Sequence, residues 1–151
     1  MKAKDVMTKE VITIPHRATY EEAVRILHEN HISGAPVVDE KDHLVGIISE
    51  KDLFRGLFPK YGNYYKRPEA YVDLEAREAK IEEIKSDPVE NFMIPMKDVV
   101  SILPNTPILM VGAIMLARGF HRMPVMEDGK IVGLVTRDQI YGSIFKKYLG
   151  L

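Results

Sequence analysis

Apolar and polar positions follow the same order twice along the chain. A short β-branched segment comes first, then an amphipathic segment with helical periodicity, then two apolar segments joined by a polar turn, and last a second amphipathic segment. This order predicts strand, helix, strand, strand, helix in each half. The segments expected as strands are 11–14, 35–38 and 44–48 in the first half, and 99–102, 123–126 and 131–135 in the second.

The ends of the expected helices carry recognisable signals. Thr19 and Glu22 form a capping-box pattern, in which the hydroxyl accepts from an amide of the first turn and the carboxylate reaches back. In the second half Pro107 is a first-turn proline, and Gly119 favours a left-handed stop. The second polar turn contains Asp-Gly, which is typical of a tight hairpin. The last helix of each half is expected to begin at Ser49 or Thr136.

The two halves also match residue by residue. Pro124 follows Pro36 by 88 residues, whereas Gly133 follows Gly46 by 87, because the second turn is one residue shorter. Two repeats of roughly 50 residues therefore flank an insert. The expected organisation is a first repeat at 1–57, an insert at 58–89 and a second repeat at 90–151.

One repeat has only three strands and two helices, which are too few to close a core. We therefore expect the repeats to fold together. The expected fold class is α/β, of the α+β kind, with two β-α-β-β-α repeats related by a pseudo-twofold, their sheets facing each other, and a helical linker inserted between them. This packing would leave two clefts between the repeats.

The chain resembles a tandem pair of cystathionine-β-synthase (CBS) domains, a unit often called a Bateman module. The resemblance rests on a hydrophobic-Pro-Val-hydrophobic-Asp strand at Ala35–Asp39, on a hydrophobic-Gly-hydrophobic-hydrophobic-Ser/Thr-x-x-Asp segment at Val45–Asp52, and on the recurrence of both. It covers roughly residues 5–57 and 90–146. Members of this family commonly bind AMP, ADP, ATP or S-adenosylmethionine between the repeats, often to regulate an attached or partner protein. The resemblance implies an adenine-containing nucleotide as a regulatory ligand, with no cofactor required.

The first repeat has the complete Ser-x-x-Asp pattern. By the resemblance, Ser49 approaches the ribose or phosphate, and Asp52 accepts hydrogen bonds from the ribose hydroxyls. The chemistry fits, since a helix N-terminus favours an anion and a carboxylate is a natural acceptor for a vicinal diol. A helix cap made by the same two residues is the alternative. The second repeat has Thr136 but carries Gln139 in place of the aspartate, which favours an ordinary capping box there. The cleft that holds Asp52 is therefore the favoured one.

A His-Arg pair precedes the second motif proline, where the first repeat has uncharged residues. A similar pair in the γ subunit of AMP-activated protein kinase reaches nucleotide phosphates, and a planar guanidinium suits phosphate. The alternative is that both residues are solvated. The residues expected in the favoured cleft are Ser49, Lys51, Asp52, Val99, Val100, Ser101, His121, Arg122, Met123 and Pro124. Those expected in the weaker cleft are Ile12, Thr13, Ser33, Gly34, Ala35, Thr136, Arg137 and Gln139.

Composition narrows the choice of partners. Twenty-one basic and 22 acidic residues give a formal net charge of −1, which disfavours a duplex-binding protein. The chain has no cysteine, so it forms no disulfide. The histidines other than His121, at positions 16, 28, 31 and 43, show no paired metal spacing. The first residues lack the apolar run of a signal peptide, and the most apolar segment, 108–117, is too short to cross a bilayer. That segment is expected as a buried helix, and the protein is expected in the cytoplasm without membrane attachment.

The insert is longer than an ordinary connection. Its second half, from Pro68 to Lys85, is expected as a largely exposed helix. Its first half carries four tyrosines among basic residues, which is weak evidence for stacking on single-stranded nucleic acid. A surface hairpin, or a lid that docks a partner, are the other interpretations.

No catalytic motif is visible, since the chain lacks a nucleophile elbow, a Walker loop, a dinucleotide-binding glycine pattern and a zinc-protease motif. We therefore expect a protein that is not an enzyme. The first hypothesis is a nucleotide sensor that signals to an unidentified protein partner. The second is a dimeric interaction scaffold with vestigial clefts, and the third, disfavoured by charge, is a regulator associated with nucleic acid.

The helices are expected to mediate self-association. Apolar residues on the helices of the second repeat predict a face that stacks on a twofold mate, giving a disc-like homodimer. The residues expected on that face are Val111, Ile114, Met115, Ile140 and Ile144.

Overall fold

The computed structural model describes residues 1–58 and 74–151, and these form two compact units that do not follow chain order. The central unit contains Thr13–Glu40 and Val45–Lys97. The C-terminal unit contains Met1–Ile12, Lys41–Leu44 and Asp98–Leu151. The first twelve residues, which were expected in the first repeat, therefore belong to the unit that contains most of the second, and residues 90–97, which were expected in the second repeat, belong to the central unit.

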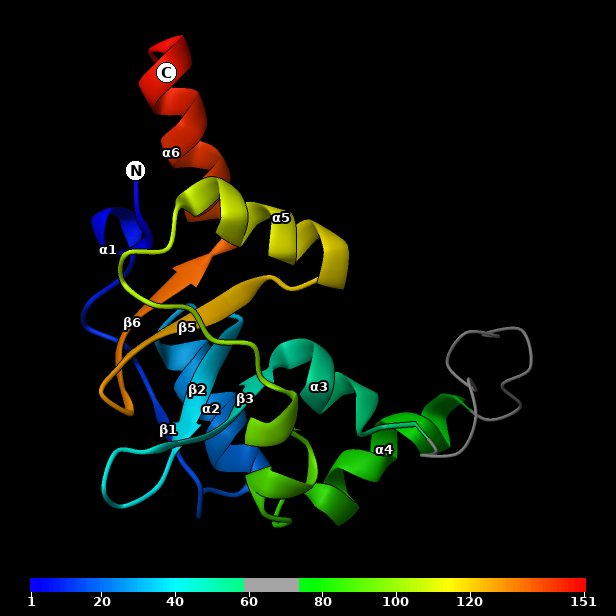
Figure 1. The fold of residues 1–151 in the computed structure, drawn as a ribbon. Coiled ribbons are helices and arrows are strands. Elements are labelled where there is room, and N and C mark those ends of the chain that lie inside the picture. The colour runs from blue at the N-terminus through cyan, green and yellow to red at the C-terminus, as the bar shows by residue number, and fades with distance from the viewer. Residues whose placement is uncertain (59–73) are drawn as a thin grey trace. The chain divides into compact units, whose positions relative to one another are not determined.

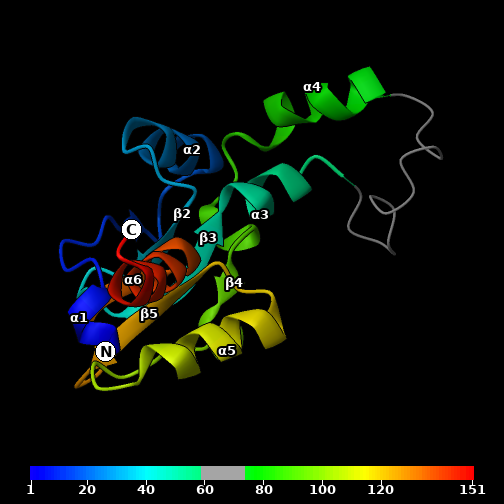
Figure 2. The same ribbon diagram turned by 90° about the horizontal axis from the view of Figure 1, so that it is seen from above.

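The central unit is built on a four-stranded sheet in the order β1-β2-β3-β4. Figure 1 labels the first three of these strands, and Figure 2 labels β2, β3 and β4. The edge strands are only two residues long: β1 runs parallel to β2 with Ile14 opposite Val37, and β4 runs antiparallel to β3 with Gly46 opposite Pro95. The strand bounds are β1 Ile14–Pro15, β2 Gly34–Val38, β3 Leu44–Ser49 and β4 Ile94–Pro95.

The helices of the central unit are α2 Tyr20–Glu29, α3 Glu50–Arg55 and α4 Leu74–Ile84, with the short 3-10 turn η3 at Val89–Asn91. The expected capping box of α2 is confirmed, because the Thr19 hydroxyl accepts from the Glu22 amide and the Glu22 carboxylate accepts from the Thr19 amide. The Tyr20 hydroxyl donates to the Leu53 carbonyl at 2.7 Å, which ties α2 to α3. The first part of the helix expected from Pro68, and the tyrosines of the insert, lie outside the described residues.

The C-terminal unit is a β-hairpin with three helices. Its strands are β5 Arg122–Glu127 and β6 Lys130–Thr136, and its helices are α1 Ala3–Val6, α5 Ile108–Arg118 and α6 Arg137–Leu149. The short 3-10 turn η4, at Met96–Asp98, ends where this unit resumes. The expected tight turn is confirmed, because Asp128 and Gly129 both have positive φ, as a hairpin turn of this length requires. Gly119 ends α5 in the left-handed conformation, as expected.

Two of the six expected strands were largely wrong. Of residues 11–14 only Ile14 enters a strand, and of 99–102 only Ile102 pairs, through a single parallel bridge to Val125. The Ile102 amide donates to the Pro124 carbonyl and the Ile102 carbonyl accepts from the Met126 amide. A β-branched sequence favours extended backbone, but a strand also needs a neighbouring strand that offers free backbone N–H and C=O groups along its length. Segments 11–14 and 99–102 each have such a neighbour at only one or two residues.

The motif glycines of the two repeats occupy equivalent crowded positions. A Cβ at Gly46 would lie 2.5 Å from the Ile94 carbonyl oxygen, because β4 crosses β3 at that point. A Cβ at Gly133 would meet the side chain of Met7, which lies near the start of the first repeat. Each motif glycine thus packs against the opening segment of the other repeat, and the missing side chain leaves room for that segment.

Part of the apolar surface expected for self-association is instead core. Val111, Met115 and Ile140 are almost fully buried in the C-terminal unit, and Ile114 and Ile144 pack against them. The segment 108–117, expected as a buried helix, is a helix that is buried on one side, at Ile108, Val111 and Met115. Its other side is not buried, because Leu109 and Leu116 are 71% and 73% exposed. Within residues 1–58 and 74–151, no helix has the length and apolar character needed to cross a membrane.

The His16 imidazole lies between two carboxylates of the central unit, those of Glu40 and Glu90. Its Nδ1 lies 2.9 Å from Glu90 Oε1 in η3, and its Nε2 lies 3.0 Å from Glu40 Oε1, which also pairs with Arg17. The hydrogen bond to Glu90, and then the Glu40 carboxylate, raise the pKa of His16 above its ordinary value.

This cluster predicts a stability that depends on pH. Because the folded-state pKa of His16 is raised, its contribution should be complete below the unfolded-state pKa of about 6.5 and should be lost as pH rises through the folded-state value. His16→Gln should flatten the dependence of the urea midpoint on pH between about 5.5 and 8. His28→Gln, on the exposed side of α2, is the matched control. An unchanged slope in His16→Gln would contradict the assignment.

Candidate functional site

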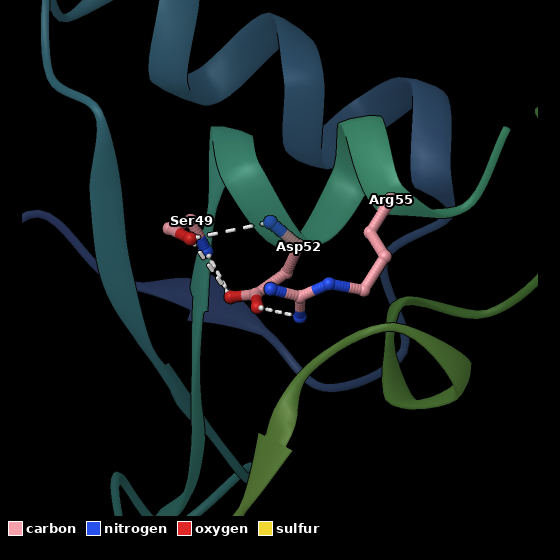
Figure 3. Close-up of polar contacts among 3 residues, drawn as sticks. All are labelled: Ser49, Asp52 and Arg55. Atoms are coloured by element: carbon pink, nitrogen blue, oxygen red, sulfur yellow. Dashed lines mark hydrogen bonds and ion pairs between the residues drawn. The ribbon is translucent and has the colours of Figure 1, made fainter. Parts of the chain in front are cut away.

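Ser49 and Asp52 form a reciprocal cap at the start of α3 (Figure 3). The Ser49 side chain accepts from the Asp52 amide at 3.3 Å. In return, Asp52 Oδ2 accepts from the Ser49 amide at 2.9 Å and from the Ser49 hydroxyl at 2.8 Å. The capping interpretation of this pair is therefore correct as a description of the structure.

The second oxygen of Asp52 has a different partner. Asp52 Oδ1 lies 3.3 Å from Arg55 Nη1, one turn along α3, and the Arg55 side chain is 44% exposed. Asp52 itself is only 7% exposed, so its charge is held by the two Ser49 donors and by Arg55. A carboxylate has about four acceptor sites, and the three bonds of Asp52 leave Oδ1 with capacity for a further donor.

Arg55 was missed by the sequence analysis. The signal that could have found it is its position three residues after Asp52, where one turn of helix brings an arginine beside a carboxylate. The Arg55 guanidinium therefore lies beside Asp52 Oδ1. By the family resemblance, the Asp52 carboxylate is the group that accepts hydrogen bonds from the ribose.

The second repeat has the corresponding cap without a charge. The Thr136 side chain accepts from the Gln139 amide at 3.3 Å, and Gln139 Oε1 accepts from the Thr136 amide at 2.9 Å. Gln139 Nε2 donates to the Thr8 hydroxyl at 2.8 Å. Both ends of the Gln139 amide are therefore engaged within the C-terminal unit, and Thr8 is a partner that the repeat comparison did not indicate.

The residues before the motif prolines take equivalent places in the two units. The Ser33 carbonyl accepts from the Glu50 amide, and the His121 carbonyl accepts from the Arg137 amide, both at 2.9 Å. Arg122 begins β5 and pairs in the strand register with Thr136, the N-cap residue of α6. This brings Arg122, Thr136 and Arg137 to one end of the C-terminal unit.

The remaining expected site residues differ in what they could offer a ligand. Gly34, Ala35, Met123 and Pro124 are buried in strands, and the side chains of Ala35 and Met123 belong to the two cores. Thr13, Val99 and Val100 are half-buried, whereas Ile12, Ser33, Lys51, Ser101 and His121 are exposed. In the parts of the chain that the structure describes, no group of three histidine or acidic side chains could hold a metal ion.

The curated relatives of this chain include two proteins from Methanocaldococcus jannaschii. The chain is 26% identical over 133 residues to uncharacterised protein MJ1225, covering 88% of this chain and 39% of that protein. It is 29% identical over 154 residues to uncharacterised protein MJ1426, covering 95% of this chain and 91% of that protein. The chain therefore spans well under half of one relative and most of the other.

Solved structures share the fold. The CBS domain of a CBS domain-containing membrane protein from Sphaerobacter thermophilus is 30% identical with a TM-score of 0.71, covering 94% of this chain and 86% of that one. The AMP complex of CBSX2 is 22% identical, with a TM-score of 0.72, covering 97% of both chains. The CBS domain pair of MJ0100, solved with 5′-methylthioadenosine and S-adenosyl-L-methionine, is 24% identical with a TM-score of 0.72, covering 97% of this chain and 98% of that one.

The family match is specific to both repeats. The CBS domain family matches residues 3–58 and again residues 89–146, which together make up most of the chain. These are the segments in which the Pro-Val strands, the motif glycines and the helix caps recur. The chain belongs to the CBS domain family, as a tandem pair of CBS repeats.

Proposed function

We propose that this chain is a non-catalytic regulatory module that binds an adenine-containing nucleotide, of the AMP, ADP and ATP class or the related S-adenosylmethionine, and signals its binding to a partner. The observation that carries the proposal is Asp52, a buried carboxylate with one oxygen fixed by Ser49 and the other turned to an exposed arginine. The AMP complex of CBSX2, and the MJ0100 pair solved with two adenosine derivatives, support the ligand class.

The chemistry of Asp52 suits a ribose. The two Ser49 donors hold the carboxylate in one rotamer, so a ligand would meet an acceptor that is already oriented. Oδ1 can accept from a hydroxyl, and the Arg55 guanidinium beside it is a donor that suits a phosphate oxygen. Lys51 lies in the first turn of α3, next to this cap. By the family resemblance we also assign His121, Arg122 and Val99–Ser101 to the favoured nucleotide site.

The chain is also proposed to act as a homodimer through its helical faces, without a required cofactor or metal. The alternative function is a dimeric interaction scaffold whose ligand sites are vestigial. A specific observation favours it: Asp52 and Gln139 are both already engaged in caps, so neither needs a ligand to satisfy it. The two functions differ in whether a nucleotide binds at all.

The two caps predict unequal sites. Gln139 offers a neutral oxygen where Asp52 offers a charged one, so the second site should be weaker by about 1–2 kcal/mol, the difference between a charge-assisted and a neutral hydrogen bond. Calorimetric titration with AMP, ADP and ATP should therefore fit one strong site per chain. Two equal sites would show that Asp52 does not set the difference, and no binding by any of these ligands or by S-adenosylmethionine would favour the scaffold.

A further inference from the structure

The Asp52 carboxylate has room for one further hydrogen bond but not for two. A carboxylate offers about four acceptor positions, two on each oxygen. Oδ2 accepts from the amide and the hydroxyl of Ser49, and Oδ1 accepts from Arg55 Nη1, so donors within the described part of the chain take three of the four. A ribose whose two hydroxyls both donate to this carboxylate needs two positions. One of the three donors must therefore leave when such a ligand binds.

The three donors are not held equally firmly. The two Ser49 bonds, at 2.9 and 2.8 Å, belong to the reciprocal cap of α3. The Arg55 contact is longer, at 3.3 Å, whereas a hydrogen bond between a guanidinium and a carboxylate usually measures about 2.7–2.9 Å. The Arg55 side chain is also 44% exposed, so water can solvate the guanidinium when it moves away. Arg55 is therefore the donor that a ligand would displace.

Arg55 nevertheless has a role when no ligand is bound. The Asp52 side chain is only 6% exposed, and a carboxylate buried to this extent is costly unless a cation lies beside it. The two residues lie one turn apart, and Figure 3 shows both side chains directed to the same side of α3. The guanidinium thus compensates the charge of Asp52 until a ligand arrives. Because both residues belong to one helix, it stays close to the carboxylate after it has been displaced.

The displaced cation makes the charge of the ligand important. Adenosine offers the guanidinium no new partner. S-Adenosylmethionine carries a sulfonium cation on its 5′ carbon, which a nearby guanidinium repels. A 5′-phosphate places an anion on the same ligand, and the planar guanidinium can donate two hydrogen bonds to it.

We propose that Arg55 competes with the ribose for the Asp52 carboxylate, and that its displacement makes the site select adenosine ligands with a 5′-phosphate over adenosine and S-adenosylmethionine. This inference rests on the nucleotide binding proposed above and specifies which ligand chemistry the site prefers. Arg55 is a specificity-determining residue in this account, because it leaves Asp52 at little cost only when the ligand brings an anion.

Arg55→Gln tests the proposal, since it removes the guanidinium and its charge but keeps a polar side chain. Adenosine should bind severalfold more tightly, because the carboxylate no longer has to exchange one donor for another. AMP should bind more weakly, because its phosphate loses a charge-assisted bond. Calorimetric titration should therefore show that the preference for AMP over adenosine falls about tenfold or more. S-Adenosylmethionine should gain more affinity than adenosine does.

Two further variants identify the cause of the change. Arg25→Gln removes the same charge from α2, where Arg25 pairs with Glu21 away from Asp52, and should leave the preference for AMP unchanged. Combining Arg55→Gln with Asp52→Asn should abolish the gain in adenosine affinity, because no charged carboxylate remains for the two donors to share.

The outcomes separate this inference from the proposed function. An unchanged preference for AMP in Arg55→Gln overturns the inference and leaves nucleotide binding in place. A gain in adenosine affinity that persists beside Asp52→Asn also overturns it, since Arg55 would then act through its charge alone. If neither adenosine, AMP nor S-adenosylmethionine binds the unmodified chain, both proposals are wrong.

A measurement on the unmodified chain does not depend on how well Arg55→Gln folds. In ¹⁵N-labelled protein the Nε–H signal of Arg55 can be assigned by its loss in Arg55→Lys. Saturating AMP should shift that signal, because the guanidinium moves from the carboxylate to the phosphate. A signal that stays in place while AMP binds overturns the inference.

Discussion

Asp52→Ala should weaken the binding of every adenine ribonucleotide about tenfold to a hundredfold. The change removes an acceptor whose bonds to a ligand would be charge-assisted, worth about 1.5–3 kcal/mol. Asp52→Asn should lose most of the same affinity, since it keeps the shape and the capping oxygen but not the charge. Calorimetric or fluorescence titration with AMP against the unmodified chain measures both.

The cap of α3 must be separated from the site, because Asp52 serves both. Asp52→Ala should also lower the free energy of unfolding by about 1 kcal/mol, through loss of the reciprocal cap with Ser49. Thr19→Ala, which removes the reciprocal cap of α2 outside the proposed site, is the matched control for that loss. A variant Asp52→Ala that melts at a lower temperature but binds AMP as tightly as the unmodified chain would show that Asp52 is a cap and nothing more.

Gly46→Ala should destabilise the fold by about 1–3 kcal/mol, whereas Gly133→Ala should cost clearly less. At Gly46 the added methyl would overlap the Ile94 carbonyl oxygen, at 2.5 Å, and the Met93 sulfur, at 2.6 Å. The carbonyl belongs to the β3–β4 pairing, so relief requires β4 to move. At Gly133 the three atoms nearest to the methyl all belong to the Met7 side chain, whose two closest atoms, Sδ and Cγ, can move by a change of rotamer.

Denaturant unfolding of the two glycine variants gives the comparison directly. The midpoint should fall more for Gly46→Ala than for Gly133→Ala, with similar slopes if both still unfold in one transition. Equal losses of unfolding free energy in the two variants would contradict this account. They would show that a backbone carbonyl near Gly46 and a methionine side chain near Gly133 hinder the added methyl group to the same extent.

The sequence was sufficient for the elements whose signals are local. Thr19, Ser49 and Thr136 cap helices because each has a partner three residues later, and such a cap closes within one turn whatever surrounds it. The turn at Asp128 and the stop at Gly119 are equally local. The two family repeats followed from the spacing of these signals.

Features that depend on distant partners were not predictable in the same way. The hydrogen bond of Gln139 to Thr8 spans 131 positions, and nothing in either repeat pattern indicates it. The start of each repeat packs in the unit that holds the rest of the other repeat: Met7 lies against Gly133, and β4 lies against Gly46. These contacts join residues far apart in the sequence, so no local pattern predicts them. Helical periodicity identified α5 as apolar but did not distinguish its buried side at Val111 from its exposed side at Leu109, because both sides are apolar.

The central claim is that Asp52 accepts a hydrogen bond from the ribose of the nucleotide. Its most direct test is a thermodynamic cycle that removes the Asp52 carboxylate and the ribose 2′-hydroxyl, separately and together. AMP and 2′-deoxy-AMP are titrated into the unmodified chain and into Asp52→Ala under identical conditions. If Asp52 accepts from the ribose, the deoxy ligand should bind the unmodified chain more weakly than AMP, and the two ligands should bind the variant almost equally, since both changes remove the same interaction. Additive losses, or AMP binding that neither change affects, would contradict the assignment of Asp52 as the ribose acceptor.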